Sequence, residues 1–278
     1  MSPVQKALWY VESHFLSPVS LDDVAGTSGV SAYHLTRAFA SATGLSLMRY
    51  VRARRLTEAA KQLSSGAGDI LRVALDAGYN SHESFTRAFK NHFGVTPEEA
   101  RARGSSHHLP YTEAITLSTT PATELAPPRV ETLPAKVMVG IVERHETGSP
   151  GGIPNQWQRF GPHLGTVAGQ LGDASYGVCF NFDEEAKFDY LCGVEVSGTA
   201  GTPAGLVRLD IPAQRYAVFA HTGHIAGISA TMSSIWNKAL PESGHKPTNG
   251  PMLERYGPEF DPTTGLGGLE VWVPVENR

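Results

Sequence analysis

The chain has 278 residues, enough for two domains of ordinary size, and it carries 23 Lys and Arg against 27 Asp and Glu, a net charge of −4. Over the whole chain this acidic balance argues against a nucleic-acid-binding protein. No apolar run approaches the length of a membrane span, and the start lacks the basic residues and unbroken apolar core of a signal peptide. We therefore expect a cytoplasmic protein.

The first predicted element is a helix over residues 1–15. Its apolar side chains recur every three or four residues, at Val4, Leu8, Val11 and Phe15. This spacing gives the helix one apolar face, which we expect to pack against the rest of its domain.

A nine-residue stretch beginning at Ser31, SAYHLTRAF, recurs fifty residues later as SHESFTRAF, beginning at Ser81. A glycine precedes each copy, Gly29 and Gly78, and can take the left-handed conformation that ends a helix and turns the chain. The serine can then cap the next helix by accepting from its free N–H groups. Each copy is therefore predicted to be a helix-turn-helix, and the repeat indicates one structural unit used twice.

Two interpretations of this repeat are open. In an ordinary helical bundle and in a DNA-binding unit alike, the apolar residues four apart would pack inward. The polar face favours DNA, because Arg37 and Arg87 occupy matching positions between the core residues. Arginine can make paired hydrogen bonds with guanine in the major groove.

Between the two units, residues 46–63 contain no glycine or proline and are predicted to form a helix capped by Ser46. At about 1.5 Å per residue this helix is a rod of roughly 27 Å. With the packed ends added, the two recognition helices would lie about 34 Å apart, one turn of B-DNA. One chain could therefore enter two adjacent major grooves of double-stranded DNA.

Charge separates the two parts of the chain. Residues 1–104 carry 12 Lys and Arg against 9 Asp and Glu, an excess of three positive charges, whereas residues 105–278 carry 11 against 18. The part with the paired helices is thus the basic one, as neutralisation of the DNA backbone requires.

Residues 21–101 resemble the DNA-binding domain of the AraC/XylS transcription regulators. The resemblance rests on SLDDVAGTSGVSAYHLTRAF, RYVRARRLTEAAKQL and ILRVALDAGYNSHESFTRAFKNHFGVTPEEAR. It implies an all-α domain of seven helices over residues 1–104, and RNA polymerase is a candidate partner of such a regulator. The candidate DNA contacts lie on the second helix of each unit: Tyr33, His34, Thr36 and Arg37 in the first, and His82, Glu83, Ser84 and Arg87 in the second.

Residues 105–128 are rich in Ser, Thr and Pro and are predicted to form a linker with one short strand at residues 113–117. His107 and His108 in this linker have no third candidate ligand, so we interpret them as solvated residues and not as a metal site. Cys179 and Cys192 lie in apolar, strand-like contexts and are predicted to be free core thiols.

Residues 129–278 contain a second repeat, at an offset of 78 residues. In both LPAKVMVGIVERHETG and IPAQRYAVFAHTGHIAG, a strand is joined through a Pro-Ala turn to a second strand. A helix with a tryptophan follows each, NQWQRFGPHLGTVAGQL with Trp157 and ISATMSSIWNKAL with Trp236, and two strands follow each helix. We expect an α+β domain of two β-α-β-β repeats that join into one mixed sheet with pseudo-two-fold symmetry, its helices flanking a groove.

These repeats resemble the GyrI-like effector-binding domain, most closely in IPAQRYAVFAHTG, LERYGPEF and the final VWVPV. The resemblance implies a groove for small, hydrophobic, often cationic ligands, with a carboxylate on the groove floor at the position of Glu254. Tyr256 lies two residues further on, hence on the same face of the strand.

A carboxylate among aromatic rings suits a cation, because ring faces attract positive charge and a carboxylate at low dielectric neutralises it. The candidate ligand contacts are Glu254, Tyr256, Trp236, Trp157, Phe160, Tyr190 and Glu195, the last as the candidate from the symmetry-related half. The alternative interpretation makes Glu254 a solvent-facing strand residue and the single aromatic residues part of the core.

The sequence favours a transcription regulator that binds DNA through residues 1–104 and senses a small effector through residues 129–278, with no cofactor and no metal. One alternative is a GyrI-like ligand hydrolase fused to a DNA-binding domain, since some stand-alone relatives resemble hydrolases that use the groove glutamate and a tyrosine. The absence of a Ser-His-Asp order, a phosphate loop and metal-ligand spacing disfavours this enzyme. A third interpretation makes the second domain a protein-binding module.

Overall fold

The computed structural model describes residues 1–66, 69–104, 109–116, 124–147, 152–198 and 201–277. From residue 3 onward the chain divides into two compact units, one of residues 3–32 and 46–118 and the other of residues 33–45 and 119–278. No helix in the described ranges is long and apolar enough to cross a membrane.

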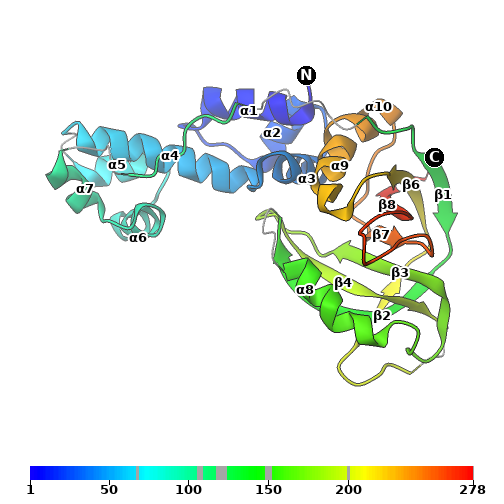
Figure 1. Ribbon diagram of the computed structural model, residues 1–278. Helices are drawn as coiled ribbons and strands as arrows, with labels where there is room; N and C mark the ends of the chain where they lie inside the picture. The colour runs from blue at the N-terminus through cyan, green and yellow to red at the C-terminus, as the bar shows by residue number, and fades with distance from the viewer. Residues whose placement is uncertain (67–68, 105–108, 117–123, 148–151, 199–200, 278) are drawn as a thin grey trace. The chain divides into compact units, whose positions relative to one another are not determined.

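The described chain before residue 105 contains seven helices, as predicted (Figure 1): α1 (Pro3–His14), α2 (Leu21–Ser28), α3 (Ala32–Thr43), α4 (Leu47–Ser64), α5 (Ile70–Asp76), α6 (His82–Phe93) and α7 (Pro97–Arg103). Their ends follow the predicted caps. The Ser46 and Ser81 hydroxyls accept hydrogen bonds from backbone N–H groups three residues on, at the starts of α4 and α6. Gly29 and Gly94 end α2 and α6 in the left-handed conformation.

The second helix-turn-helix unit, α5 with α6, closes around an aromatic core. Phe85, Phe89 and Phe93 lie on one face of α6, are buried, and belong to one apolar cluster with Leu56 and Leu63 of α4. Successive phenylalanine rings of α6 are 5.5 and 4.7 Å apart between centroids. This packing fixes which face of α6 points away from the core.

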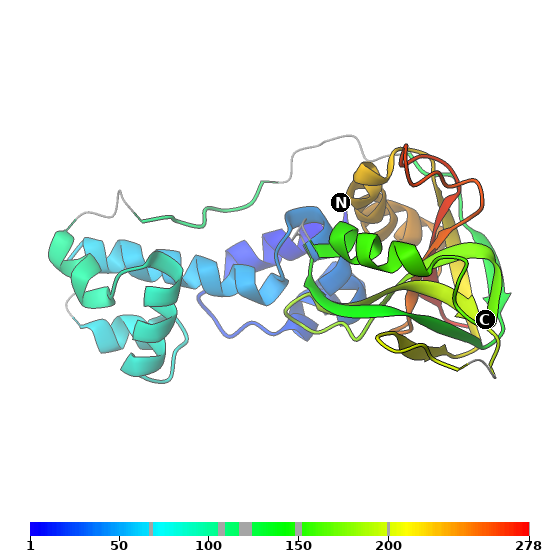
Figure 2. The same cartoon turned by 60° about the horizontal axis from the view of Figure 1, so that its bottom comes forward.

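Residues 109–116 form an extended segment that runs along α4 (Figure 2). The short strand predicted at residues 113–117 is not found in residues 113–116, because α4 side chains bind backbone groups of this stretch in place of a partner strand; residue 117 is outside the described ranges. Leu109 and Tyr111 pack against the apolar cluster that α4 shares with α6.

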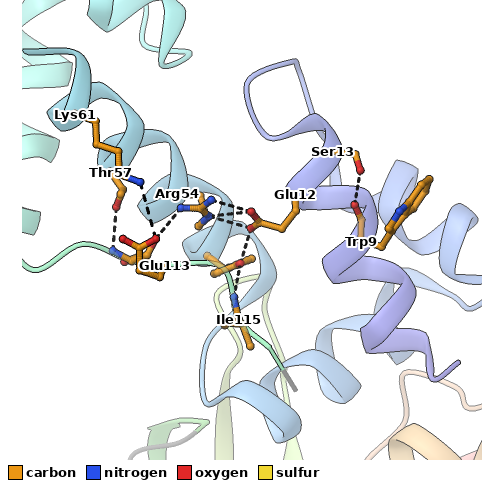
Figure 3. Close-up of polar contacts among 10 residues, drawn as sticks. Trp9, Glu12, Ser13, Arg54, Thr57, Lys61, Glu113 and Ile115 are labelled. Carbon is orange, nitrogen blue, oxygen red and sulfur yellow. Dashed lines mark hydrogen bonds and ion pairs between the residues drawn. The ribbon is translucent and has the colours of Figure 1, made fainter. Parts of the chain in front are cut away.

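A polar network holds this segment on α4 (Figure 3). The Arg54 guanidinium binds both carboxylate oxygens of Glu12 in α1, at 2.8 and 2.9 Å, and donates a further hydrogen bond to the Thr112 carbonyl oxygen at 2.9 Å. The Tyr50 hydroxyl donates to Glu12 at 2.6 Å and accepts from the Ile115 N–H at 3.0 Å. Residues 109–116 are therefore bonded to the helical unit, not a free tether.

The second unit contains an eight-stranded sheet of β1 (Arg129–Leu133), β2 (Lys136–Glu146), β3 (Gln170–Phe180), β4 (Lys187–Val196), β5 (Val207–Ile211), β6 (Gln214–His221), β7 (Met252–Tyr256) and β8 (Leu269–Val275). The strand order is β1-β6-β8-β7-β3-β4-β2-β5, and every ladder is antiparallel. The α+β class is confirmed. The predicted mixed sheet is wrong, because turns between paired neighbours such as β3 and β4 are too short for a parallel crossover.

The two halves of the sheet exchange their first strands. β1 of the first half pairs with β6 of the second, with Arg129 opposite Val218, and β5 of the second half pairs with β2 of the first, with Val207 opposite Gly140. Each half is thus β-β-α-β-β: the strand before each Pro-Ala turn, which the sequence predicts but the β-α-β-β repeat does not count, belongs to the same sheet. The two ladders are one ladder repeated 78 residues later, as the predicted pseudo-two-fold symmetry requires.

The helices of the second unit are α8 (Gly152–Phe160) with the 3-10 turn η1 (Gly161–His163), then the 3-10 turn η2 (Ile225–Gly227), α9 (Ile228–Ser234), the π-helical turn η3 (Ile235–Ala239) and α10 (Leu240–Ser243). The first helix is shorter than predicted, because Pro162 has no N–H to continue it and Gly165 takes a left-handed conformation before β3 begins. α8 lies across β2 and β4 (Figure 1).

The segment along α4 should stabilise the helical unit. We predict that a fragment of residues 1–118 has a higher free energy of unfolding than one of residues 1–104, by about 2–4 kcal/mol, from its hydrogen bonds and from burial of Leu109 and Tyr111. Urea denaturation followed by circular dichroism measures the difference.

A matched substitution separates this contribution from fragment length. Thr57 of α4 accepts the Thr112 N–H at 3.0 Å, so Thr57→Val should destabilise the longer fragment by about 1 kcal/mol more than the shorter one. Equal stability of the two fragments, or an equal effect of Thr57→Val in both, would contradict the prediction.

Candidate functional sites

α6 presents a polar face opposite its buried phenylalanines. His82, half-buried, bonds Glu98 of α7 at 3.0 Å between Nε2 and Oε1, and Ser84 donates its N–H to the capping serine. The remaining side chains line an open hollow on the helix surface with His82: Glu83, Thr86, Arg87, Lys90 and Asn91. Of these, Glu83, Arg87, Lys90 and Asn91 are exposed.

The chemistry of this face suits double-stranded DNA. Arg87 offers paired donors for a guanine edge, and Lys90 one turn later offers positive charge for a phosphate. The pKa of the exposed Glu83 carboxyl is lowered, mainly by a hydrogen bond from the Glu83 backbone N–H and next by one from the Ser81 side chain. The carboxylate therefore stays ionised and can accept a hydrogen bond from a cytosine amine.

Sequence analysis did not identify Lys90 and Asn91 as candidate contacts. Both were visible in the sequence, because they lie three and four residues after Arg87, the spacing that places side chains on one helix face. Comparing the two copies did not reveal them, since the matching positions of the first copy are Ala40 and Ser41, neither of which carries a positive charge for a phosphate.

The candidate contacts on α3 are placed differently from those on α6. His34, Thr36 and Arg37 are buried, and Tyr33 is half-buried. The Arg37 guanidinium donates to the Tyr33 hydroxyl one turn earlier, at 3.1 Å. A base contact from Arg37 therefore requires that this side chain become exposed, whereas Arg87 is exposed already.

The candidate effector site is centred on Glu254 of β7, which is only 9 % exposed. Its Oε2 atom accepts two hydrogen bonds, from the Tyr190 hydroxyl of β4 at 2.7 Å and from the Tyr256 hydroxyl at 3.1 Å. The alternative that Glu254 is a solvent-facing strand residue is therefore wrong. Tyr256 meets it, as the alternation of side chains along a strand predicts.

The donors in this network have a fixed direction. Trp157 of α8 can only donate through Nε1, and it does so to the Tyr190 hydroxyl at 3.0 Å. Tyr190 therefore accepts from Trp157 and uses its single proton for Glu254. Tyr256 uses its own proton for the same carboxylate oxygen, so the network treats Glu254 as an acceptor.

Aromatic rings surround the carboxylate. The Trp157 ring meets the Tyr256 ring edge to face, with centroids 5.0 Å apart, and Phe260 meets Tyr256 on another side at 4.9 Å. Phe160, one turn after Trp157 on α8, is fully buried, with its ring 6.2 Å from that of Trp157. Trp157 and Phe260 are half-buried, so of this group these two rings can meet a ligand without a change in the core.

Burial sets the acid–base properties of the site. It raises the pKa of Glu254 above its ordinary value, and the hydrogen bonds from the two tyrosines oppose that shift without overcoming it. Burial likewise raises the pKa values of Tyr190 and Tyr256 well above the ordinary phenol value, and the nearby Glu254 charge adds to the effect. Both hydroxyls therefore remain protonated donors.

A buried glutamine, missed by the sequence analysis, fixes α8 on the sheet. The Gln156 amide group donates to the carbonyl oxygens of Ile141 in β2 and Tyr190 in β4, both at 2.8 Å, and its Oε1 lies 2.7 Å from His145 Nε2. Gln156 precedes Trp157, so these bonds also position the indole over Tyr190. A polar residue in the apolar stripe of α8 was the available indication.

Two candidate ligand contacts from the sequence lie apart from this network. Trp236 is almost fully buried in the π-helical turn, and among the described residues it makes no hydrogen bond or ring contact with the Glu254 network. Glu195 of β4 forms an ion pair with Lys136 at 2.6 Å. Its interpretation as the symmetry counterpart of Glu254 is wrong, because Glu254 lies on β7 and the equivalent strand of the first half is β3, not β4. Register along β4 places it at the far end from Tyr190.

Cys179 and Cys192 are free and buried, as predicted. Burial raises the pKa of Cys179 well above the ordinary thiol value, and the charge of Glu254 raises it further. His107 and His108 lie outside the described residues.

Comparison with known proteins identifies both parts of the chain. A GyrI-like small molecule binding domain matches residues 126–276, and a helix-turn-helix domain matches residues 24–103. The transcriptional regulator Rob of Salmonella typhimurium is 26% identical over 280 residues, which cover 94% of this chain and 92% of Rob. The multiple antibiotic resistance protein MarA of the same species is 40% identical over 98 residues, 35% of this chain and 77% of MarA. The solved structure of SAV2435 bound to tetraphenylphosphonium is 22% identical, with a TM-score of 0.45, covering 55% of this chain and 95% of that one.

The exposed face of α6 predicts two kinds of DNA contact. At a DNA site selected by the protein from genomic fragments, Arg87→Ala should weaken binding by about 1–3 kcal/mol and relax the preference at one base position. Lys90→Ala should weaken matched and mismatched sites alike and make the salt dependence of log K shallower by about one unit. Binding curves at several salt concentrations measure both effects.

Arg103→Ala is the control, because Arg103 is an exposed arginine at the end of α7, outside the hollow on α6. It should leave base preference unchanged. Wild-type affinity and footprint in Arg87→Ala at physiological salt would contradict the assignment of α6.

Proposed function

Because the chain belongs to the AraC-type transcription regulators that carry a GyrI-like small molecule binding domain, we propose that it responds to a small hydrophobic cation bound at Glu254. One observation carries the proposal. Glu254 is a buried carboxylate whose hydrogen-bond partners are two neutral hydroxyls, and no Lys or Arg in the described residues pairs with it. Buried charges in proteins are ordinarily paired, so this carboxylate suits a counter-charge that a ligand brings.

The surrounding rings define the chemistry of that ligand. The faces and edges of Trp157 and Tyr256 offer apolar area and attract positive charge. A cation with flat apolar groups would gain from burial of its rings, from the aromatic faces and from the carboxylate together. A small hydrated cation would gain only the attraction of the carboxylate, since it has no apolar rings to bury. It would also lose its hydration shell, which costs free energy.

DNA recognition is assigned to the helix-turn-helix pair. We propose that α6 enters a major groove with Arg87 at a base edge and Lys90 at a phosphate, joined by Glu83 as acceptor for a cytosine amine. The first recognition helix, α3, is proposed to enter the adjacent groove once Arg37 is exposed. The predicted separation of one DNA turn stays a prediction.

A regulatory role is favoured over the enzyme alternative. The relative that matches 94% of this chain is a transcriptional regulator. Glu254 is bonded to two tyrosines with raised pKa values, which makes it a fixed acceptor and leaves neither tyrosine as a nucleophile near neutral pH.

Removing the carboxylate charge while keeping its shape tests the effector site. We predict that Glu254→Gln weakens binding of methyltriphenylphosphonium by about 2–4 kcal/mol, whereas the neutral isostere triphenylphosphine oxide loses far less. Titration calorimetry gives both affinities, and their ratio is the measured quantity. Affinity for the cation should also fall with decreasing pH, beginning above the ordinary glutamate pKa, because the pKa of Glu254 is raised and protonation removes the charge. The tyrosines and Cys179 beside it are already protonated over that range.

Glu195→Gln is the matched control, since Glu195 is a half-buried carboxylate on a nearby strand that Lys136 already neutralises. It should leave the ratio of the two affinities unchanged. Equal losses for cation and neutral isostere in Glu254→Gln, or no loss for either, would show that Glu254 is not the counter-charge.

A further inference from the structure

The strand position opposite Glu254 carries no side chain. β3 and β7 pair with Ser175 opposite Tyr256 and Cys179 opposite Met252, so the middle pair of the ladder is Gly177 and Glu254. In the first half Cys192 lies between Ile141 and Gly177, and in the second half Val271 lies between Phe219 and Glu254. Ile141 and Phe219 are equivalent, 78 residues apart, so the registers make Gly177 and Glu254 equivalent, and the pseudo-two-fold axis passes between them. The position that is a carboxylate in one half is a glycine in the other.

Space, not backbone conformation, requires this glycine. A Cβ atom on residue 177 would lie 2.8 Å from Glu254 Oε2 and 2.7 Å from Tyr190 Cζ, and nearer still to the Tyr190 hydroxyl oxygen. Separations below 3.0 Å essentially never occur for real Cβ atoms. Gly177 is not among the residues with positive φ, so any residue could adopt its backbone conformation.

The two oxygens of Glu254 are held unequally. Oε2 accepts both tyrosine hydroxyls, and within the described chain Oε1 accepts no hydrogen bond. A carboxylate oxygen can accept two hydrogen bonds, so the protein saturates one oxygen and leaves the acceptor capacity of the other.

We propose that Gly177 is the positioning residue of the effector site: the space left by its missing side chain lets the Tyr190 hydroxyl hold Oε2, so that Oε1 meets the positive charge of the ligand. This role rests on the proposed function. It also gives the site a defined charge. A glutamate at both equivalent positions would place two like-charged side chains directly opposite each other, with Cβ atoms about 5 Å apart, whereas the glycine leaves a single negative charge, suited to a monovalent cation.

The test compares two probes of similar shape, methyltriphenylphosphonium and triphenylphosphine oxide, on the full chain. Gly177→Ala should weaken binding of the cation at least tenfold and of the neutral probe less than threefold, because the displaced tyrosine no longer holds the carboxylate. Tyr190→Phe removes only the hydroxyl and should produce the same selective loss. Gly198→Ala is the glycine control, since a Cβ atom there would have no neighbour within 4 Å, and it should change neither affinity.

A second pair of variants tests the cause. Tyr190→Leu removes the two Tyr190 atoms that a Cβ atom at residue 177 would strike, and it also removes the hydrogen bond that holds Glu254 Oε2 near that position. In that background Oε2 is free to move away from the added Cβ atom and the tyrosine contact is already lost, so Gly177→Ala should cost the cation less than threefold. Near-ultraviolet circular dichroism reports whether each variant is folded. If Gly177→Ala does not fold, Tyr190→Phe alone tests the inference, because it should show the same selective loss of affinity for the cation.

The outcomes separate this inference from the proposed function. If the wild-type protein binds the cation and the neutral probe equally, recognition of a cation fails, and the role of Gly177 fails with it. If the wild type prefers the cation and Glu254→Gln abolishes that preference, but Gly177→Ala or Tyr190→Phe leaves it intact, only the role of Gly177 is overturned.

Discussion

A carboxylate buried without a positive partner is the constraint on which the second unit depends. Burial raises the pKa of Glu254, so in the ligand-free protein the ionised carboxylate lowers the free energy of unfolding. This destabilisation is present at pH values above the ordinary glutamate pKa and disappears as the carboxylate is protonated. Two tyrosine hydroxyls offset part of this cost. A bound cation would offset more of the desolvation cost of the carboxylate, and the part that it offsets contributes to the free energy of binding.

Several features of the fold follow from keeping that carboxylate in place. The order β7-β3-β4 brings Glu254 and Tyr190 together from strands that are not neighbours, across the glycine of β3 between them. Gln156 fixes α8 on β2 and β4, which positions Trp157 to set the direction of the Tyr190 hydroxyl. The antiparallel sheet with exchanged first strands interlocks the two halves around this centre, because each half supplies an edge strand to the other.

The sequence predicted what is encoded locally. Glycine turns, serine caps and helical periodicity place the helices of the N-terminal part nearly to the residue, and strand alternation correctly joins Tyr256 to Glu254. It could not predict properties that depend on tertiary neighbours. The repeat makes Arg37 and Arg87 equivalent, yet one is buried and the other exposed. The repeat in the sequence suggested Glu195 as a second carboxylate in the symmetry-related half, but only the strand register shows that the counterpart of Glu254 is Gly177. Low-complexity composition predicted a linker, although part of that segment is bonded to α4.

The ionisation of Glu254 tests the central claim most directly. Titration of the 13C-labelled glutamate carboxyl by nuclear magnetic resonance, with the Glu254 resonance identified by its loss in Glu254→Gln, reports its pKa with and without methyltriphenylphosphonium. In the free protein the Glu254 carboxyl should titrate above the ordinary glutamate pKa of about 4.3, because it is buried without a positive partner. Its pKa should fall when the cation binds. An ordinary pKa that the cation leaves unchanged would contradict the assignment of Glu254 as the counter-charge.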